Sequence, residues 1–452
     1  MEMNPQVWAA EQWGTCKFGD PRRTSRAVEM GGLMAAHPER SLPGQMGSWA
    51  ETVGGYRLLN NTHVSGQELW RPHLEATRAA AREEELVLFV QDGTTLIYTS
   101  HAATAGIGPV GSKKQRGILL HSVIAVVPEG KRVLGLAYLQ TIIRPDQPVT
   151  RPRRREQGPE GEVWANGVKA VGPAPAGVKW VHVSDRESDM YGYMAECINE
   201  GKGVVVRAFR NRKVGVGPRG AEAGKLIEEA RRLLPKSGPR HTYAVSVAAT
   251  KKTPARQAQI VLSWCKMKVP PTSSGENDRV LDIWVVRAWE QNPPAGATRV
   301  EWILLTSERV ETATAAARIV EWYTCRWLVE DYHMCLKTGC RVEDSQLDHG
   351  ADLQRLLGFA APLAVRLLQL RQIVRNVPDV PASHAVDPLL IQLLAAKLHL
   401  AIDMSITRFW SGVAQLGGHL GRKSDGPPGW RTMWLGWSTL NEYAVGARLV
   451  SS

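Results

Sequence analysis

Strand-like segments with acidic ends constrain the fold of this chain more than any other feature. Residues 84–140 hold three apolar runs rich in β-branched residues, and the polar turns between them predict three neighbouring strands. Two further strands are predicted at residues 178–184 and 203–207. Four more apolar runs between residues 240 and 305 predict an antiparallel β module with Pro- and Gly-rich connections.

Helical patterns flank the strands on both sides. Near the N-terminus, Asp20 is an expected N-cap and Pro21 an expected first helical residue. A long helix is predicted from about Thr312 to Lys337, and the remaining residues are helical in pattern, with breaks at 376–388 and 421–430. The chain is therefore predicted to be an α/β protein.

Three parts follow from this order of elements. Residues 1–70 are expected to form a helical domain. Residues 71–370 are expected to form the main α/β domain, with the β module inserted at about 215–300. Residues 371–452 are expected to form a second helical domain.

The charge balance favours an anionic partner. The 452 residues include 56 Lys and Arg against 44 Asp and Glu, a formal charge of +12. This basic excess favours nucleic acid as a partner, although a basic enzyme without such a partner could have the same composition. Six cysteines in so long a chain favour a reducing cytosol over a disulfide scaffold. Neither a signal peptide nor a run long enough to span a bilayer is expected.

Two aspartates stand at the ends of predicted strands. Asp92 follows "ELVLFVQ" and Asp185 follows "WVHVS". A carboxylate in such a setting is costly to bury unless it is paired or binds a metal. In open α/β sheets the ends of neighbouring strands meet at one edge, so the two acids can converge there.

The predicted helix at residues 321–340 offers a third carboxylate, Glu330. If this helix is continuous, Tyr323, Arg326, Trp327, Glu330 and Lys337 share a sector of about 100°. One acid, two cations and two aromatic rings make a poor core stripe. They suit a carboxylate that binds metal, flanked by groups that hold phosphate.

The three acids together indicate a metal-dependent phosphodiester reaction. Asp92, Asp185 and Glu330 are the hard oxygen ligands that Mg²⁺ or Mn²⁺ prefers. Two such ions can activate a water or a 3′-hydroxyl and stabilise the leaving oxygen. Each acid alone would be weak evidence, since an Asp at the end of a strand is more often a turn residue.

Other polar clusters have competing interpretations. Cys325, Cys335 and Cys340 with His333 could be zinc ligands, but a helix spreads them around its circumference, which favours buried structural cysteines. His121 is expected to be a core histidine or a contact of the DNA backbone. The arginines at the start of the first long helix, the basic loop 113–116 and the arginines after residue 206 are candidate DNA contacts, with a solvated basic surface as the alternative. These candidates are Arg22, Arg23, Arg26, Lys113, Lys114, Arg116, Arg207, Arg210 and Arg212.

The set Tyr323-x2-Arg326-x3-Glu330-x6-Lys337 resembles the signature of the IS-four superfamily of DDE transposases, and the chain is most similar to the Tn-five-type transposases. The similarity runs through nearly the whole chain. It is carried by "GDPRRTSR" (19–26), "GGYRLLNN" (54–61), "QDGTTLIY" (91–98), "SDRESDMYGYM" (184–194), "VVVRAFRNRK" (204–213), "WILLTSE" (302–308), "YTCRWLVEDYHMCLKTG" (323–339), "AVRLLQLR" (364–371) and "AQLGGHLGRK" (414–423).

The resemblance implies a cut-and-paste transposase with an RNase H-like catalytic core and a β-rich insertion before the Glu. The N-terminal domain would bind the transposon end, and the C-terminal helices would form a homodimer. Similar enzymes cut double-stranded DNA through a hairpin intermediate, join it to target DNA, and act on the end bound by the partner subunit. A bacterial, cytoplasmic and nucleoid-associated protein is implied.

The motifs shared with this family assign roles to individual residues of this chain. Asp92, Asp185 and Glu330 would bind two Mg²⁺ ions, for which Mn²⁺ can substitute, while Tyr323, Arg326 and Lys337 would hold phosphates. Trp302 matches a Trp that stacks on a base flipped out of the duplex, and Trp327 matches a second aromatic residue there.

Two departures from the family pattern stand out. Met334 occupies the position of a DNA-contacting Lys, and the stretch "RPRRRE" is basic where an acidic one is expected. Two other functions remain open. One is a catalytically inactive DNA-binding relative or inhibitor of transposition, and the other is a metal-dependent nuclease without strand transfer.

Overall fold

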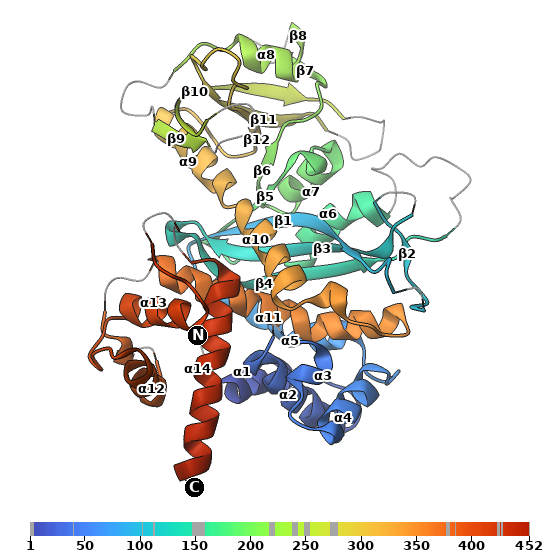
Figure 1. The fold of residues 1–452 in the computed structure, drawn as a ribbon. Coiled ribbons are helices and arrows are strands. Elements are labelled where there is room, and N and C mark those ends of the chain that lie inside the picture. Colours follow the sequence, from blue (N-terminus) through green and yellow to red (C-terminus); the bar gives the residue numbers. More distant parts are fainter. Residues whose placement is uncertain are drawn as a thin grey trace.

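The computed structural model describes residues 4–451 with gaps at 39, 102, 112–113, 147–158, 217–221, 237–242, 248–253, 272–278, 377–379, 385, 423–424 and 426–427. Its centre is one large mixed sheet with helical regions at both ends of the chain (Figure 1). The strands are β1 (Leu86–Ile97), β2 (Gly108–Pro109), β3 (Arg116–Val127), β4 (Arg132–Ile142), β5 (Lys179–Ser184), β6 (Gly203–Arg207), β7 (Lys213–Val216), β8 (Glu222–Lys225), β9 (Tyr243–Val247), β10 (Arg256–Val269), β11 (Leu281–Glu290) and β12 (Glu301–Thr306).

The helices cover the sheet and form the two ends of the chain. They are α1 (Pro5–Trp13), α2 (Pro21–Ala36), α3 (Leu42–Gln45), α4 (Trp49–Leu59), α5 (Gly66–Arg82), α6 (Pro159–Ala170), α7 (Tyr191–Asn199), α8 (Leu226–Arg232), α9 (Ala313–Thr324), α10 (Trp327–Met334), α11 (Gly350–Asn376), α12 (Pro388–Leu398), α13 (Ile406–Leu416) and α14 (Trp430–Ser451). No helix among these residues is long and apolar enough to cross a bilayer.

The first three predicted strands are indeed neighbours. β1 pairs antiparallel with β3, and β3 pairs antiparallel with β4. On its other side β1 pairs parallel with β5, and β5 pairs parallel with β6. The strands of the β module are antiparallel to one another, as predicted, but they do not stand apart, because β12 pairs with β6 and so extends the central sheet.

Two local expectations need correction. Asp92 does not end its strand, because β1 continues to Ile97 along β3. The helix around residue 325 is not continuous either: α9 ends at Thr324, α10 begins at Trp327, and a π-helical turn covers Cys335–Gly339. The shared sector was derived for a continuous helix, so the positions of these side chains are taken from the structure instead.

The N-terminal and C-terminal helices share one apolar core. Trp13 of α1 packs against Phe359 of α11 with ring centroids 5.1 Å apart, and its indole N–H donates to the Gly358 carbonyl at 3.3 Å. The predicted start of the second helix is confirmed, since Asp20 caps α2 by accepting from the backbone N–H of Arg22. A second apolar core lies between α6, α7 and the face of the sheet that these two helices cover.

Candidate active site

Asp92 and Asp185 lie side by side on neighbouring parallel strands. The register pairs Gln91 of β1 with Ser184 of β5, so each acid follows a paired residue. Asp92 accepts from the backbone N–H of Gly93 at 2.8 Å, and Asp185 accepts from that of Glu187 at 2.7 Å. The convergence expected from the sequence is therefore present.

Glu330 reaches the same place from α10. The Arg326 guanidinium donates to the Glu330 carboxylate at 2.5 Å and lies 3.7 Å from a carboxylate oxygen of Asp92. It also lies over the ring of Trp327, 4.3 Å from the centroid. One cation thus links two of the acids, and Trp327, half of whose surface is exposed (50%), forms the outer wall.

The pKa of the Asp92 carboxyl is shifted by this environment. Burial, followed by the charge of Asp185, raises the pKa of the Asp92 carboxyl to about 7, and Glu330 acts in the same direction. Arg326 and the N–H of Gly93 oppose the rise only in part. A carboxyl with such a raised pKa is typical of a functional site.

Tyr323 and Trp302 lie beside the acids. Burial raises the pKa of the Tyr323 phenol, against the opposing effect of Arg326 and Arg207 and with the help of Asp185. The rings of Trp302 and Tyr323 meet edge to face with centroids 5.3 Å apart. Arg207 at the end of β6 thus belongs to the same group of side chains.

Lys337 and Met334 lie on the next turns. Lys337 is half-buried within the π-helical turn, and Met334 is exposed at the end of α10. Cys325, Cys335 and Cys340 are buried thiols, and burial raises the pKa of Cys325 and of Cys340. Within the described residues, no group of three or more His, Cys, Asp or Glu is arranged to hold a metal ion.

His121 occupies the opposite face of the sheet. It is buried, its Nε2 lies 3.0 Å from the side-chain oxygen of Gln91, and its ring meets that of Trp164 edge to face. This is the core alternative, since a ring enclosed in this way offers no surface to DNA. The same network includes His182 and Tyr193, which the sequence did not single out.

The arginines of α2 have partners within the protein. Arg22 pairs with Asp20 at 3.1 Å, Arg26 pairs with Glu29 at 2.7 Å, and Arg23 donates to the Phe18 carbonyl at 2.6 Å. Arg22 and Arg26 remain accessible at the surface. Arg116 pairs with Asp146, and Lys114 is exposed in the turn before β3. Lys113 lies outside the described residues.

The arginines after β6 divide into two kinds. Arg212 is buried and pairs with the buried Asp189, so it holds the loop rather than facing DNA. Arg210 is partly exposed. Phe209, which directly precedes Arg210, is an exposed aromatic residue that the sequence analysis missed, although its place among arginines was a signal.

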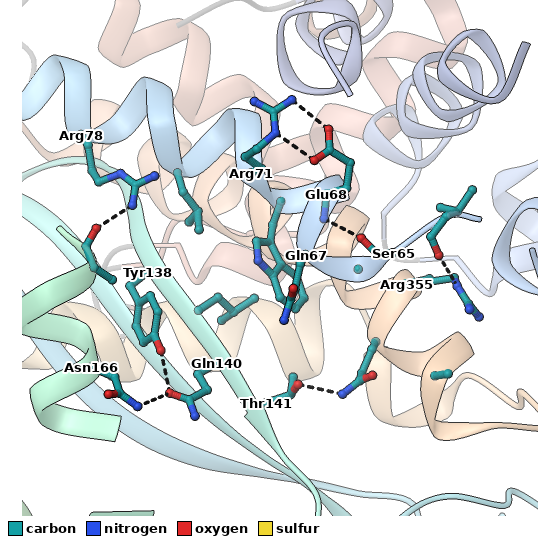
Figure 2. A pocket seen from close by; sticks show the side chains of 18 of the residues that line it. Ser65, Gln67, Glu68, Arg71, Arg78, Tyr138, Gln140, Thr141, Asn166 and Arg355 are labelled. Atoms are coloured by element: carbon teal, nitrogen blue, oxygen red, sulfur yellow. Dashed lines mark hydrogen bonds and ion pairs between the residues drawn. The ribbon is translucent and has the colours of Figure 1, made fainter. Parts of the chain in front are cut away.

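Away from the three acids, a cavity of about 950 Å³ lies between α5, β4, α6 and α11 (Figure 2). Its charged and polar groups satisfy one another. Arg71 pairs with Glu68 at 2.8 Å, and both Tyr138 and Asn166 donate to the side-chain oxygen of Gln140. None of the three acids lines it, so its size does not make it the candidate site.

Two comparisons with protein families frame this geometry. Residues 5–64 match the transposase DNA-binding domain, and residues 363–452 match the transposase Tn5 dimerisation domain. Together the two matches support a Tn5-type transposase. In this transposase the first match covers α1 to α4, and the second covers the end of α11 and all of α12 to α14. The sheet that carries the acids lies between the two matched regions.

Proposed function

We propose that this transposase cuts and joins DNA with Asp92, Asp185 and Glu330 as its catalytic acids. The observation that carries the proposal is the meeting of these three carboxylates beside Arg326 and Tyr323, in a chain with transposase domains at both ends. The order β4-β3-β1-β5-β6, antiparallel through β1 and parallel after it, supports an RNase H-like core.

The chemistry of the donor set fits a divalent ion, although the described side chains are not arranged around one. Three carboxylates and one guanidinium leave an excess of negative charge. Burial and then the charge of Asp185 raise the pKa of Asp92, and a bound cation would favour its charged form. Asp92, Asp185 and Glu330 would hold two Mg²⁺ or Mn²⁺ ions, with Arg326 giving up part of its contact with the acids. When bound, such ions supply Lewis-acid activation of the attacking and leaving oxygens.

The remaining side chains position DNA. A water attacks the scissile phosphorus, the P–O3′ bond breaks, and a 3′-hydroxyl and a 5′-phosphate are released. Arg326, Lys337 and Tyr323 hold phosphate oxygens during this step. The free 3′-hydroxyl then attacks a phosphorus of the opposite strand, the P–O3′ bond there breaks, and the flanking DNA leaves with a 3′-hydroxyl while the element end closes into a hairpin. The flipped base of this hairpin stacks on Trp302 and Trp327. A second hydrolysis reopens the hairpin and restores the 3′-hydroxyl, which attacks a phosphorus of the target and displaces a 3′-oxygen of the target strand.

The partners follow from the two matched domains. Residues 5–64 would bind the transposon end, and residues 363–452 would pair two copies of the chain, so that each active site acts on the end held by the partner.

Cleavage of the element's own terminal repeat tests the proposal. Wild-type protein with Mg²⁺ is expected to give paired-end complexes, hairpins and joined target. Asp92→Asn keeps the size of the side chain but removes its charge, and should slow cleavage by more than about a hundredfold while sparing binding. Asp403→Asn, at an exposed acid far from the site in sequence, is the control.

Three outcomes contradict the proposal. Wild-type protein that binds the repeat but never cuts it would be an inactive relative or an inhibitor of transposition. Cleavage with neither hairpins nor joined target would indicate a simple nuclease. Full activity of Asp92→Asn would remove the acids from the mechanism.

A further inference from the structure

Phe209 is an exposed aromatic ring on a rigidly held backbone. It follows β6 directly, and 62% of its surface is accessible. The backbone N–H groups of Phe209 and Arg210 both donate to one carboxylate oxygen of Asp189 at 2.7 Å. Asp189 is itself completely buried and also pairs with Arg212. A buried charge is thus committed to fixing the loop that presents this ring to solvent.

The ring lines a cavity of about 510 Å³, whose lining includes the two residues that follow Asp185 in sequence. Arg186 directly follows Asp185, and its guanidinium carbon lies 5.9 Å from the centroid of Phe209. Arg210 lines the same cavity, and Trp164 and Met190 supply an apolar wall. A planar apolar face with guanidinium groups at its edge is the surface that stacks a nucleobase.

This cavity is separate from the tryptophans already assigned. Trp164 and Met190 belong to the core between the sheet and α6 and α7, whereas Trp302 packs against the core on the face that carries α9. The edge of the sheet that bears Asp185 lies between them. DNA placed at the acids could therefore meet an aromatic surface on either side.

Charge decides which part of a nucleotide enters. Glu160 and Glu187 also line the cavity, and Glu160 is held by Arg144 at 2.6 Å. These two carboxylates balance Arg186 and Arg210, so the lining has no excess positive charge that would draw a phosphate inside. A neutral base can enter, while its phosphate stays at the rim near Arg186.

We propose that Phe209 and Arg186 form a stacking platform for one unpaired base of the DNA strand that passes the acids. This inference rests on the proposed function, since it assumes that DNA lies at Asp92 and Asp185. It adds a second base site to the reaction, on the α6 side of the sheet edge.

Tailed and blunt duplexes test the platform without any cleavage. The full chain is titrated in EDTA, by fluorescence anisotropy, against a 20-base-pair duplex that is either blunt or carries a four-thymidine tail on its 3′ or 5′ end. Wild-type protein should bind the duplex with at least one tail polarity about tenfold more tightly than the blunt duplex. A 2-aminopurine in that tail should be quenched on binding.

Substitutions of the ring separate stacking from simple apolar contact. Phe209→Ala should lose the advantage of the tail and the quenching, with blunt-duplex affinity unchanged. Phe209→Trp should keep both, and Phe209→Leu should restore neither. Leu234→Ala, at another exposed apolar residue, is the control and should resemble wild type.

Three results would overturn the platform. The first is a wild-type protein that does not discriminate between tailed and blunt duplexes. The second is a tail advantage that survives in Phe209→Ala. The third is a change in oligomeric state with no change in tail binding, which would make the ring a protein contact. Because Asp92→Asn should retain the tail advantage, failure of the platform and failure of the catalytic proposal give different results.

Discussion

Arg326 is the side chain on which the candidate site is centred. It contacts Glu330, lies near Asp92 and stacks over Trp327, yet its Nε is buried with no hydrogen-bond acceptor among the described residues. A buried N–H without an acceptor is costly. A phosphate oxygen of bound DNA would satisfy it, which agrees with the phosphate-holding role proposed for this residue.

Arg326→Lys tests that role while keeping the charge. Lysine cannot reproduce the planar fork or the stacking, so single-turnover cleavage should slow by about tenfold or more while duplex binding changes little. The matched control is Arg318→Lys, because Arg318 lies over the ring of Trp322 at 5.5 Å and is exposed. Equal rates for the two variants would rule out a specific role for Arg326.

His73 makes the fold sensitive to acid. Its Nε2 accepts from the backbone N–H of Leu136 at 3.1 Å, and its Nδ1 lies 2.7 Å from the side-chain oxygen of Gln12, so the neutral ring is the one that fits. Burial lowers the pKa of His73 to about 4. Between pH 6.5 and 4 the unfolded chain therefore binds more protons than the folded chain.

The free energy of unfolding should accordingly fall as pH falls from 6.5 to 4, with up to about 3 kcal/mol due to His73. His73→Gln should reduce this slope in denaturant titrations across that range. His121 and His333 act in the same direction, since burial lowers the pKa of each to about 3, so part of the slope remains. An unchanged slope in His73→Gln would contradict the assignment.

At the scale of elements, α13 and α14 cross closely because both carry glycine at the contact. A Cβ on Gly436 would lie 1.7 Å from the Val413 carbonyl oxygen, and one on Gly417 would lie 1.8 Å from that of Thr432. Backbone at that distance cannot give way without moving a whole helix.

Gly436→Ala should therefore separate the two helices and destabilise the C-terminal region by about 1–3 kcal/mol, measured by thermal unfolding. Gly446 is in the same helix with nothing within 4 Å of its position. Gly446→Ala should be neutral or slightly stabilising, since alanine favours a helix over glycine by up to about 1 kcal/mol. Equal effects of the two substitutions would contradict the close crossing.

The longer strands were predictable from sequence because apolar β-branched runs identify them whatever they pack against, whereas the short strands β2, β7 and β8 were not predicted. The meeting of Asp92 with Asp185 followed from the same pattern, since neighbouring parallel strands bring their acids to one edge. The interruption between α9 and α10 was not predictable, because residues 325 and 326 keep helical backbone angles and no Pro or Gly marks the change.

Long-range pairing was the other unpredictable part. Nothing in the β module signals that β12 joins β6, since any antiparallel strand with an apolar face could pair there. Likewise the burial of His121 depends on Gln91 and Trp164, which are far apart in sequence and meet only in the folded sheet. The exposure of Phe209 could not be predicted for a similar reason, because it depends on which residues surround the ring in the folded chain.

At the scale of the whole molecule, α14 ends in an exposed apolar surface. The helix extends beyond the rest of the fold toward the C-terminus (Figure 1), and Val445, Leu449 and Val450 are exposed on its last turns. Exposed apolar groups that cluster on one element indicate an interaction surface. Because these residues lie within the match to the Tn5 dimerisation domain, a second copy of the chain is the expected partner.

Val445→Asp tests whether this surface forms the contact between two copies of the chain. In a two-fold interface each substitution occurs twice, so two carboxylates would lose water at the contact and the dissociation constant of the dimer should rise by about a hundredfold or more. Sedimentation velocity, with and without the terminal-repeat duplex, measures the change. Val280→Asp is a matched control, since Val280 is 53% exposed and Val445 is 56% exposed. If both variants dimerise as wild type does, the contact between copies lies elsewhere, and the paired-end complex must be built from another surface.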